Sequence, residues 1–237
     1  MGATHTKDNP VIHQNISYYD EIAHVYDQIM DADRSNELVR KLIREKLRRL
    51  VQSGWVIDFG GGTGLDLEWL SRAGYHIIFC EPSDAMREKA IQLNKTTILD
   101  QDIHFLDPAN TDFKQWRMQA PFSKKADALI ANFGVINYIP ELDELFQNLA
   151  AALKPGAHVL LVTLKLSLRK RLRWHRRNAL KSLVFRIPFV MYITYHTKVQ
   201  TVFVHSEKEI RKAAAAHFEF RDSQPVTGFT LIHLTRR

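Results

Sequence analysis

Short apolar runs alternate with amphipathic stretches along most of the chain. This pattern is typical of buried parallel strands connected by helices. Strands are expected at Trp55–Phe59, His76–Cys80, Ile103–Leu106, Ala126–Ala131, His158–Thr163, Thr201–His205 and Thr227–Leu234. Helices are expected at Asn36–Val51, Leu65–Ala73, Ser83–Leu93, Pro140–Leu153 and from Ser206 to His217. The pattern predicts an α/β fold with three layers, in which a seven-stranded, mostly parallel sheet ends in an antiparallel strand.

The alternation breaks between Leu164 and Lys198. A helical stripe with spacings of three and four residues runs through Leu164, Leu168, Leu172, His175, Ala179 and Leu183. An apolar and aromatic stretch follows it, up to Tyr195. We therefore expect one domain over residues 17–237, with a helical cap inserted at 165–199. The polar residues 1–16 are expected to be a flexible N-terminus.

Glycines follow the first strand, in the sequence W-V-I-D-F-G-G-G-T-G-L from Trp55 to Leu65. A strand, a glycine turn and a helix together form a common holder for a polar or anionic cofactor at a helix N-terminus. The dinucleotide fingerprint would need a glycine at position 65, which is Leu65. The observed spacing is Asp58-x-Gly60-x-Gly62-x-Gly64. A plain tight turn is the alternative, but such turns seldom need so many glycines.

Glu81 ends the second strand about 20 residues beyond the glycines, a place where a carboxylate can accept hydrogen bonds from two ribose hydroxyls. Glu81 by itself would fit a nicotinamide dinucleotide equally well. Ser83 follows it as the expected N-cap of the next helix.

The acidic-x-G-x-G-x-G motif and the phrase Glu81-Pro82-Ser83-x-x-Met86 resemble the class I S-adenosylmethionine (SAM) methyltransferases. Two further phrases strengthen the likeness. One is Tyr19-Asp20, Ala23 and Tyr26-Asp27, which resembles the lid that closes over the cofactor in this family, and the other is Leu-Lys-Pro-Gly before the fifth strand. The resemblance covers residues 17–164. It implies a Rossmann-like fold, SAM as cofactor and S-adenosylhomocysteine (SAH) as its product.

The resemblance also implies a set of cofactor-binding residues: Tyr26, Asp58, Gly60, Gly61, Gly62, Gly64, Glu81, Pro82, Met86, Leu106, Asp107, Asn132 and Phe133. Within it, Asp107 is expected to bind the adenine amino group while Leu106 supplies a backbone N–H. An Asp-Pro turn is the alternative explanation of Asp107. Ser17–Met30 equally fits an amphipathic helix that packs on the sheet.

The catalytic residue cannot be assigned from the sequence, because methyl transfer from SAM needs a base only where the nucleophile must lose a proton. The candidates are His196, Tyr195 and Tyr138, and then His175 and His205. Many relatives carry a histidine pair where this chain has Asn137-Tyr138. No metal site is expected, because no pair of histidines or cysteines has ligand spacing.

The charge is unevenly distributed. The chain carries a formal charge of +7, yet no carboxylate occurs between Glu144 and Glu207. The basic segment 165–186 inside this window has three interpretations: a solvated helix face, a helix on an anionic membrane surface, or a contact with an acidic carrier protein or substrate. The fourth strand ends in Asn132-Phe133-Gly134-Val135, which lacks the N-P-P-Y type motif of base-modifying enzymes and argues against a nucleic-acid substrate.

The single cysteine, Cys80, and the lack of an apolar run of about 18 residues predict a cytoplasmic protein, with peripheral membrane attachment as the alternative. We expect methyl transfer to an oxygen or nitrogen of a small or medium organic acceptor. The alternatives are an enzyme for a lipid-like, quinone or carrier-bound substrate at a membrane face, and a SAM-binding protein without transfer activity. The acceptor and the oligomeric state stay open.

Overall fold

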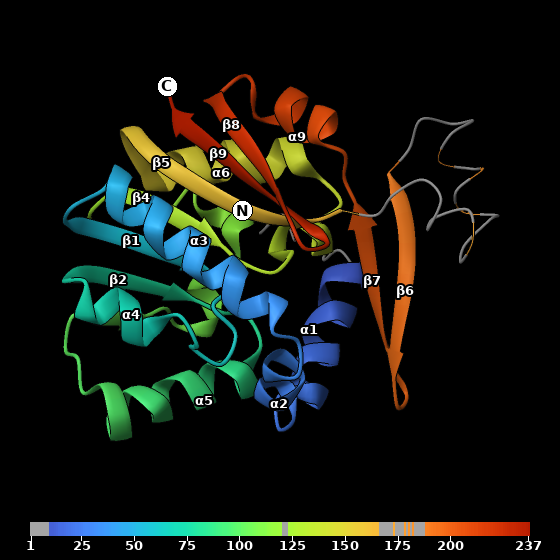
Figure 1. Ribbon diagram of the computed structural model, residues 1–237, viewed down its shortest axis with the longest axis horizontal. Coiled ribbons are helices and arrows are strands. Elements are labelled where there is room, and N and C mark those ends of the chain that lie inside the picture. Colours follow the sequence, from blue (N-terminus) through green and yellow to red (C-terminus); the bar gives the residue numbers. More distant parts are fainter. Residues whose placement is uncertain are drawn as a thin grey trace, which may run out of the picture.

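A seven-stranded sheet forms the centre of the molecule (Figure 1). The computed structural model describes residues 10–119, 123–165 and 188–237, together with Arg173, Asn178, Leu180 and Ser182. The sheet consists of β1 (Gly54–Phe59), β2 (Tyr75–Cys80), β3 (Ile103–Phe105), β4 (Ala126–Ala131), β5 (Leu153–Leu164), β8 (Phe218–Val226) and β9 (Phe229–Arg236). Its order is β3-β2-β1-β4-β5-β9-β8, and β9 runs antiparallel to the other six strands.

Helices pack on both faces of this sheet. One face carries α3 (Ser35–Leu50), α4 (Leu67–Arg72) and α5 (Asp84–Leu93), and the other carries α6 (Leu142–Ala152) and α9 (Glu207–Ala214). Val56 and Ile77 belong to the first core, whereas their chain neighbours Ile57 and Ile78 belong to the second. The strands are therefore apolar on both faces, as parallel strands between two helical layers must be. The predicted three-layer α/β fold is confirmed.

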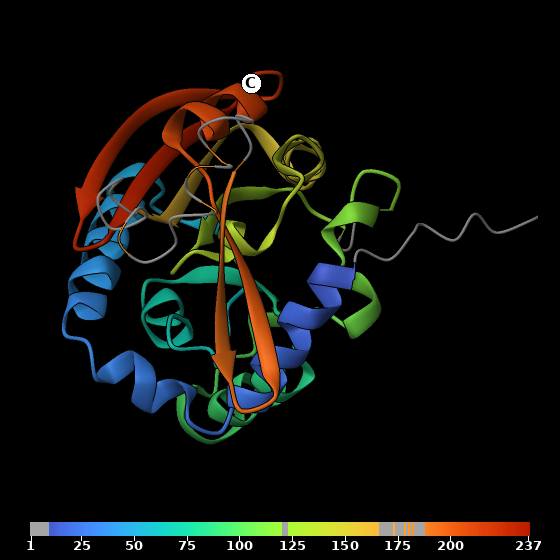
Figure 2. The ribbon, with the colours of Figure 1, turned by 90° about the vertical axis from the view of Figure 1, so that its right-hand side faces the viewer.

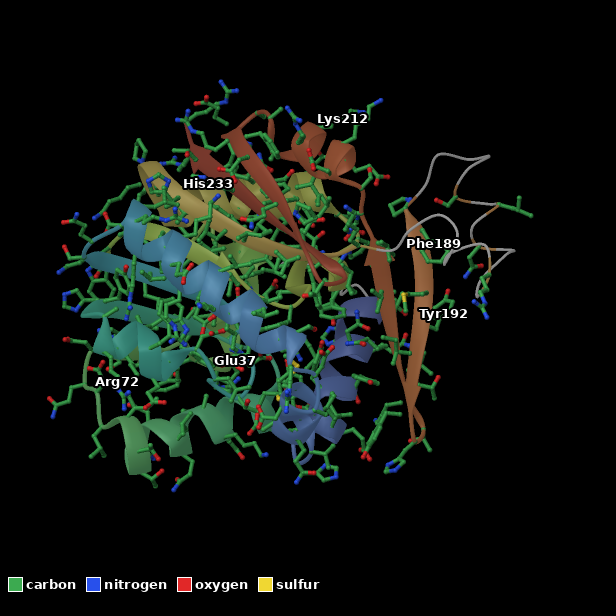
Figure 3. The ribbon with its side chains drawn as sticks, in the orientation of Figure 1. Glu37, Arg72, Phe189, Tyr192, Lys212 and His233 are labelled. Atoms are coloured by element: carbon green, nitrogen blue, oxygen red, sulfur yellow. The ribbon has the colours of Figure 1, made fainter. Side chains whose placement is uncertain are left out.

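The strand expected at Thr201–His205 does not join this sheet. β7 (Lys198–Val204) pairs instead with β6 (Phe189–Tyr195) in a separate antiparallel hairpin, which stands beside the sheet in Figures 1 and 2. Tyr192 lies on the outer strand of this hairpin (Figure 3) and is exposed. The place next to β9 is taken by β8. The sequence did not predict β8, because an edge strand is largely polar and tolerates its proline, Pro225.

Helices α1 (Pro10–Ile22) and α2 (Tyr26–Asp31) precede the sheet. Residues 10–16 were predicted to belong to a flexible N-terminus, and that prediction is wrong for them. Proline is favourable at the first helical position because its fixed φ suits the helix. The buried Asn15 then anchors α1 to the hairpin: its Oδ1 accepts the Thr201 N–H at 2.8 Å, and its Nδ2 donates to the Thr201 carbonyl at 3.0 Å. Figure 2 shows α1 running beside the hairpin.

The hairpin begins within the predicted cap insertion 165–199, and β7 continues past residue 199, where that insertion was expected to end. The first residue of the helical stripe, Leu164, ends strand β5 and is not helical. The rest of the stripe and the basic segment 165–186 fall outside the described residues, except for Lys165, Arg173, Asn178, Leu180 and Ser182. The role of that segment stays a prediction. Within the described ranges, no helix combines the length and the apolar character that a membrane span requires.

The described residues also include four short helical turns. They are η1 (Asn94–Ile98), η2 (Pro108–Asn110), η3 (Phe113–Gln115) and η4 (Val135–Tyr138). Of these, η3 lies between β3 and β4, and η4 follows β4 directly. Both carry side chains toward the site described next.

Candidate active site

The carboxyl ends of β1, β2 and β4 meet at one edge of the sheet, where the strand order reverses direction. In open α/β sheets this switch point is where ligands bind. The loop of residues 60–64 follows β1, and Glu81 follows β2. The N–H groups of Gly60 and Gly61 donate to the Cys80 carbonyl at 2.7 and 3.3 Å, which holds the loop against the end of β2.

Three of the loop glycines are needed by the packing of the protein itself. A Cβ on Gly60 would lie 2.6 Å from a methyl of Val135, and a Cβ on Gly61 would lie 2.2 Å from the ring of Phe79. A Cβ on Gly64 would lie 2.8 Å from a leucine methyl of α4. Distances this short leave no room for any side chain. At Gly60, Gly61 and Gly64 the missing side chain therefore allows close packing between parts of the protein.

Gly62 differs from the other three. Its φ is +60°, and an added Cβ would meet nothing closer than the ring of Tyr26, at 3.6 Å. Gly62 and Tyr26 both line the same cavity. The backbone at Gly62 is therefore open to a ligand, and a side chain there would occupy ligand space.

Glu81 is held in a fixed orientation at the base of the loop. Its side chain accepts the Gly62 N–H at 2.9 Å and the Ser83 N–H at 2.8 Å, and the residue is 7% exposed. Burial raises the pKa of Glu81 to about 7, although the two N–H donors and Arg87 act in the opposite direction. The carboxyl group is thus oriented before any ligand arrives, and it changes charge near neutral pH.

Asp58 lies beneath the loop. The residue is 1% exposed, and a Cβ on Gly61 would come within 2.8 Å of its Oδ2. Burial, and next the nearby Asp66, raise the pKa of Asp58 well above its usual range. Asp66 itself pairs with Arg40 at 2.8 Å and accepts the side-chain amide of Asn132 at 2.6 Å. This network ties α3, the start of α4 and the end of β4 together.

A cavity of about 320 Å³ opens at this edge. One group of lining residues, the strand-end set, comes from the glycine loop and the segments after the strands: Phe59, Gly60, Gly62, Cys80, Glu81, Pro82, Pro108, Thr111, Asp112, Asn132 and Phe133. The other, the helical set, comes from α1, α2, η3 and η4 with the residue after it: Ile12, His13, Asn15, Ile16, Tyr19, Tyr26, Phe113, Lys114, Val135, Tyr138 and Ile139.

Three tyrosines of the helical set pack edge to face. The ring of Tyr19 lies 5.4 Å from that of Tyr138 and 6.2 Å from that of Tyr26. Burial raises the pKa of each of the three hydroxyls, while the buried Gln200 beside Tyr19 and Tyr138 opposes the rise. The hydroxyls therefore stay protonated near neutral pH and act as hydrogen-bond donors rather than as bases.

The structure brings together more than half of the residues predicted to bind the cofactor. Those that line the cavity are Tyr26, Gly60, Gly62, Glu81, Pro82, Asn132 and Phe133. Asp58, Gly61 and Gly64 lie behind the cavity wall and support the loop. Met86 is buried with Tyr18, Ile22 and Ala23 under α1. Their cofactor roles stay predictions.

The segment after β3 departs from the expectation. Leu106 is buried in the core between the sheet and helices α6 and α9, and Asp107 is exposed. Neither of them lines the cavity, whereas Thr111 and Asp112 do. The turn of η2 separates the two pairs. The predicted adenine contact at Asp107 is therefore not part of the cavity wall in this structure.

Most of the predicted catalytic candidates lie elsewhere. His196 is at the turn of the β6–β7 hairpin, exposed and 3.4 Å from the Glu21 carboxylate, and Tyr195 packs beside it against the cluster under α1. His205 is buried, and its ring contacts the Ile139 carbonyl at 3.0 Å, so it supports the end of η4. His175 lies outside the described residues. Among the candidates that the structure describes, Tyr138 lines the cavity.

Among the cavity residues that the sequence analysis did not predict, two have basic side chains. His13 reaches it from α1, and Lys114 reaches it from η3, where it also pairs with Glu144 at 3.3 Å. A signal for His13 was present: Ile12, Ile16 and Tyr19 have helical spacing and extend the apolar face of α1 toward Pro10. No comparable signal marks Lys114, because only the tertiary fold brings η3 to α1. The described part of the chain contains no cluster of three or more histidine, cysteine or carboxylate side chains suited to a metal ion.

Comparisons with known proteins agree with this geometry. Residues 30–220 match the family described as methyltransferase domain. No curated protein matches the chain in sequence.

Several solved structures share the fold. One is DhpI, solved as a complex with SAM and HEP, with a TM-score of 0.71, 18% identity, and coverage of 98% of this chain and 100% of that one. A second is 1,6-didemethyltoxoflavin-N1-methyltransferase of Burkholderia thailandensis with bound 1,6-didemethyltoxoflavin and SAH, with a TM-score of 0.64, 14% identity, and coverage of 100% and 93%. A third is the N-methyltransferase NodS of Bradyrhizobium japonicum with SAH, with a TM-score of 0.63, 13% identity, and coverage of 94% and 98%. At these identities the likeness shows the fold alone.

Proposed function

The chain belongs to the methyltransferase domain family and has its class I, Rossmann-like fold, and on that premise we propose that it transfers a methyl group from SAM to an oxygen or nitrogen of a small or medium organic acceptor. The observation that carries the proposal is the cavity itself. One wall offers an open glycine backbone and a fixed carboxylate, and the other wall is largely aromatic and apolar. A polar cofactor and an organic acceptor could therefore lie in contact there.

The strand-end set fits the cofactor. Glu81 would accept hydrogen bonds from the ribose hydroxyls with the lone pairs that Gly62 and Ser83 leave free. The bare backbone of Gly62 would admit the cofactor, and Asn132 and Phe133 would border it. When bound, SAM supplies an activated methyl group on a sulfonium centre. The neighbours that were solved with SAM or SAH support this cofactor.

The helical set fits the acceptor. The Tyr138 hydroxyl, which stays protonated, would donate a hydrogen bond to the acceptor and orient its nucleophile. Where that nucleophile is a hydroxyl, its proton must leave as the new bond to the methyl carbon forms. Among the histidines that the structure describes, His13 lines the cavity, and its imidazole would hold that proton. An amine that is already neutral would need no such base.

Calorimetry tests whether the protein binds the proposed cofactor. The purified protein should bind SAM and SAH and should not bind NAD. Mass spectrometry of a panel of phenols, hydroxy acids and heterocyclic amines incubated with SAM then tests methyl transfer, since a product heavier by one methylene identifies the acceptor. Binding of NAD in place of SAM would overturn the proposal. Binding of SAM without transfer to any acceptor would favour a SAM-binding protein without transfer activity.

A further inference from the structure

Two aspartates, Asp20 and Asp27, each follow a tyrosine that lines the cavity. Tyr19 and Tyr26 belong to the cavity wall, so α1 and α2 form part of its cover. The aspartates next to them are absent from that wall. Their carboxylates instead reach two other segments of the protein, and both segments contact Glu81.

Asp27 is bonded to the glycine loop. Its Oδ1 accepts a hydrogen bond from the Thr63 hydroxyl at 2.5 Å. Thr63 is buried between Gly62 and Gly64. A hydrogen bond to an ionised carboxylate is stronger than one between neutral groups. The bond therefore fastens α2 to the loop at the residue after Gly62.

Asp20 is bonded to the turn after β2. Its Oδ1 accepts from the Ser83 hydroxyl at 2.6 Å and from the Ala85 N–H at 3.2 Å. Both donors belong to the N-terminus of α5, where a negative charge is favourable. This contact fastens α1 to the segment that follows Glu81.

Each attachment point lies at or next to one of the two residues whose N–H groups orient Glu81. The Gly62 N–H, one residue before Thr63, donates to one Glu81 oxygen at 2.9 Å. The Ser83 N–H donates to the other at 2.8 Å. A movement of α1 and α2 away from the sheet would release Thr63 and Ser83, and with them both backbone donors would lose their support.

We propose that Asp20 and Asp27 are positioning residues that couple the docking of α1 and α2 to the orientation of Glu81, so that a cofactor held by Glu81 also holds the helical cover closed. The inference rests on the proposed function, since it concerns the same cofactor site. The coupling is reciprocal: docked helices favour ligand binding, and bound ligand favours docked helices by the same free energy.

The contrary interpretation is that these bonds only stabilise the fold. The structure allows a test because α1 has independent anchors on the hairpin. Asn15 is bonded to Thr201, Gln14 donates to the Val199 carbonyl at 2.8 Å, and Lys198 donates to the hydroxyl of Ser17 at 2.8 Å. We therefore expect α1 to stay folded when Asp20 or Asp27 is replaced.

Calorimetry with SAH measures the coupling. Asp27→Ala should weaken SAH binding about tenfold or more, because one hydrogen bond to a charged group is lost. Asp27→Asn, which keeps an acceptor oxygen, should recover part of the affinity. Asp31→Ala is the matched control, since Asp31 is an exposed aspartate at the end of the same helix. A double-mutant cycle should find an interaction between Asp27→Ala and Thr63→Val, and none between Asp31→Ala and Thr63→Val.

Hydrogen exchange supplies a second readout. In the wild type, SAH should slow amide exchange in α1 and α2, and Asp27→Ala should reduce that protection. If Asp27→Ala binds SAH no more weakly than Asp31→Ala does, or if the cycle shows no interaction, the coupling is refuted.

Failure of the proposed function would look different, because then the wild type itself would not bind SAH. The coupling would still be measurable without ligand, through the titration of Glu81 followed by NMR. Asp27→Ala should shift the pKa of Glu81, because burial and the Gly62 donor set this pKa and release of α2 changes both. An unchanged titration in Asp27→Ala would refute the coupling.

Discussion

The affinity for SAH should depend on pH through Glu81. Burial raises the pKa of this carboxyl group to about 7, against the Gly62 and Ser83 donors and Arg87, while Asp20 adds to the rise. The ribose hydroxyls would donate to the ionised form, so binding selects the carboxylate. The protein must then lose a proton from Glu81 wherever the free carboxyl group is protonated, and binding should tighten as the pH rises.

The size of the effect follows from that pKa. If only the ionised form binds, the apparent Kd exceeds its limiting value by a factor of one plus ten to the power of the pKa minus the pH. The factor is about eleven at pH 6 and about one at pH 8. Binding at pH 7 should release about half a proton to the buffer.

Calorimetry in buffers with different ionisation enthalpies measures both quantities. Glu81→Gln is the control, because it keeps the shape of the side chain and removes the titration. This variant should bind SAH more weakly at pH 8, by about 1–3 kcal/mol, and its affinity should change little between pH 6 and pH 8. A wild-type affinity that is constant across this range, or an equal pH dependence in Glu81→Gln, would refute the reasoning.

The same pKa has a consequence for stability in the protein without cofactor. The folded-state pKa of Glu81 is raised from 4.5 to about 7, so the folded protein binds this proton more tightly than the unfolded chain does. The free energy of unfolding should therefore fall as the pH rises through this interval, by up to about 3 kcal/mol from this group. Urea unfolding should show this component in the wild type and not in Glu81→Gln.

Four further substitutions probe the site. Gly62→Val should abolish SAH binding in calorimetry, at a stability cost of about 1–3 kcal/mol for its positive φ. Gly64→Ala should instead destabilise the fold in thermal unfolding, because its Cβ meets packed side chains. Equal effects of the two substitutions on binding and on stability would contradict the different roles given to these two glycines. Tyr138→Phe should lower kcat for any acceptor found while leaving the Kd of SAH unchanged, and an unchanged kcat would remove Tyr138 from the acceptor site. Asn15→Ala should lower the free energy of unfolding by about 1–3 kcal/mol, since two buried hydrogen bonds to Thr201 are lost; a stability like that of the wild type in urea would show that α1 is held mainly by other contacts.

The local chemistry of the glycine loop and Glu81, within the strand-end set, could be predicted from the sequence. A glycine loop after a buried strand, and a carboxylate at the end of the next strand, depend on residues close in the chain and on a sheet that the apolar pattern predicts well. Gly62 and Glu81 accordingly lie together, as expected, and share a hydrogen bond. Ser83 caps α5, and Ser206 opens α9 with a capping box, because caps are set by neighbours within one turn.

The positions of the helical set could not be predicted from the sequence in this way. His13 and Lys114 are far apart in the chain and meet the cavity only because α1 packs on the hairpin while η3 follows β3. His196 carries the same chemistry as His13, but the hairpin turn leaves it in solvent beside Glu21. Residue type alone does not distinguish the two.

The sequence by itself determined the α/β alternation, the glycine loop and the partner carboxylate, because each of these follows from contacts within a strand, a turn or adjacent strands. The tertiary structure decided that β8 and not β7 completes the sheet, which glycine faces open space, and which side chains beyond the strand ends enclose the cavity. Those outcomes depend on packing between segments that are distant in the chain, and periodicity carries no information about such contacts.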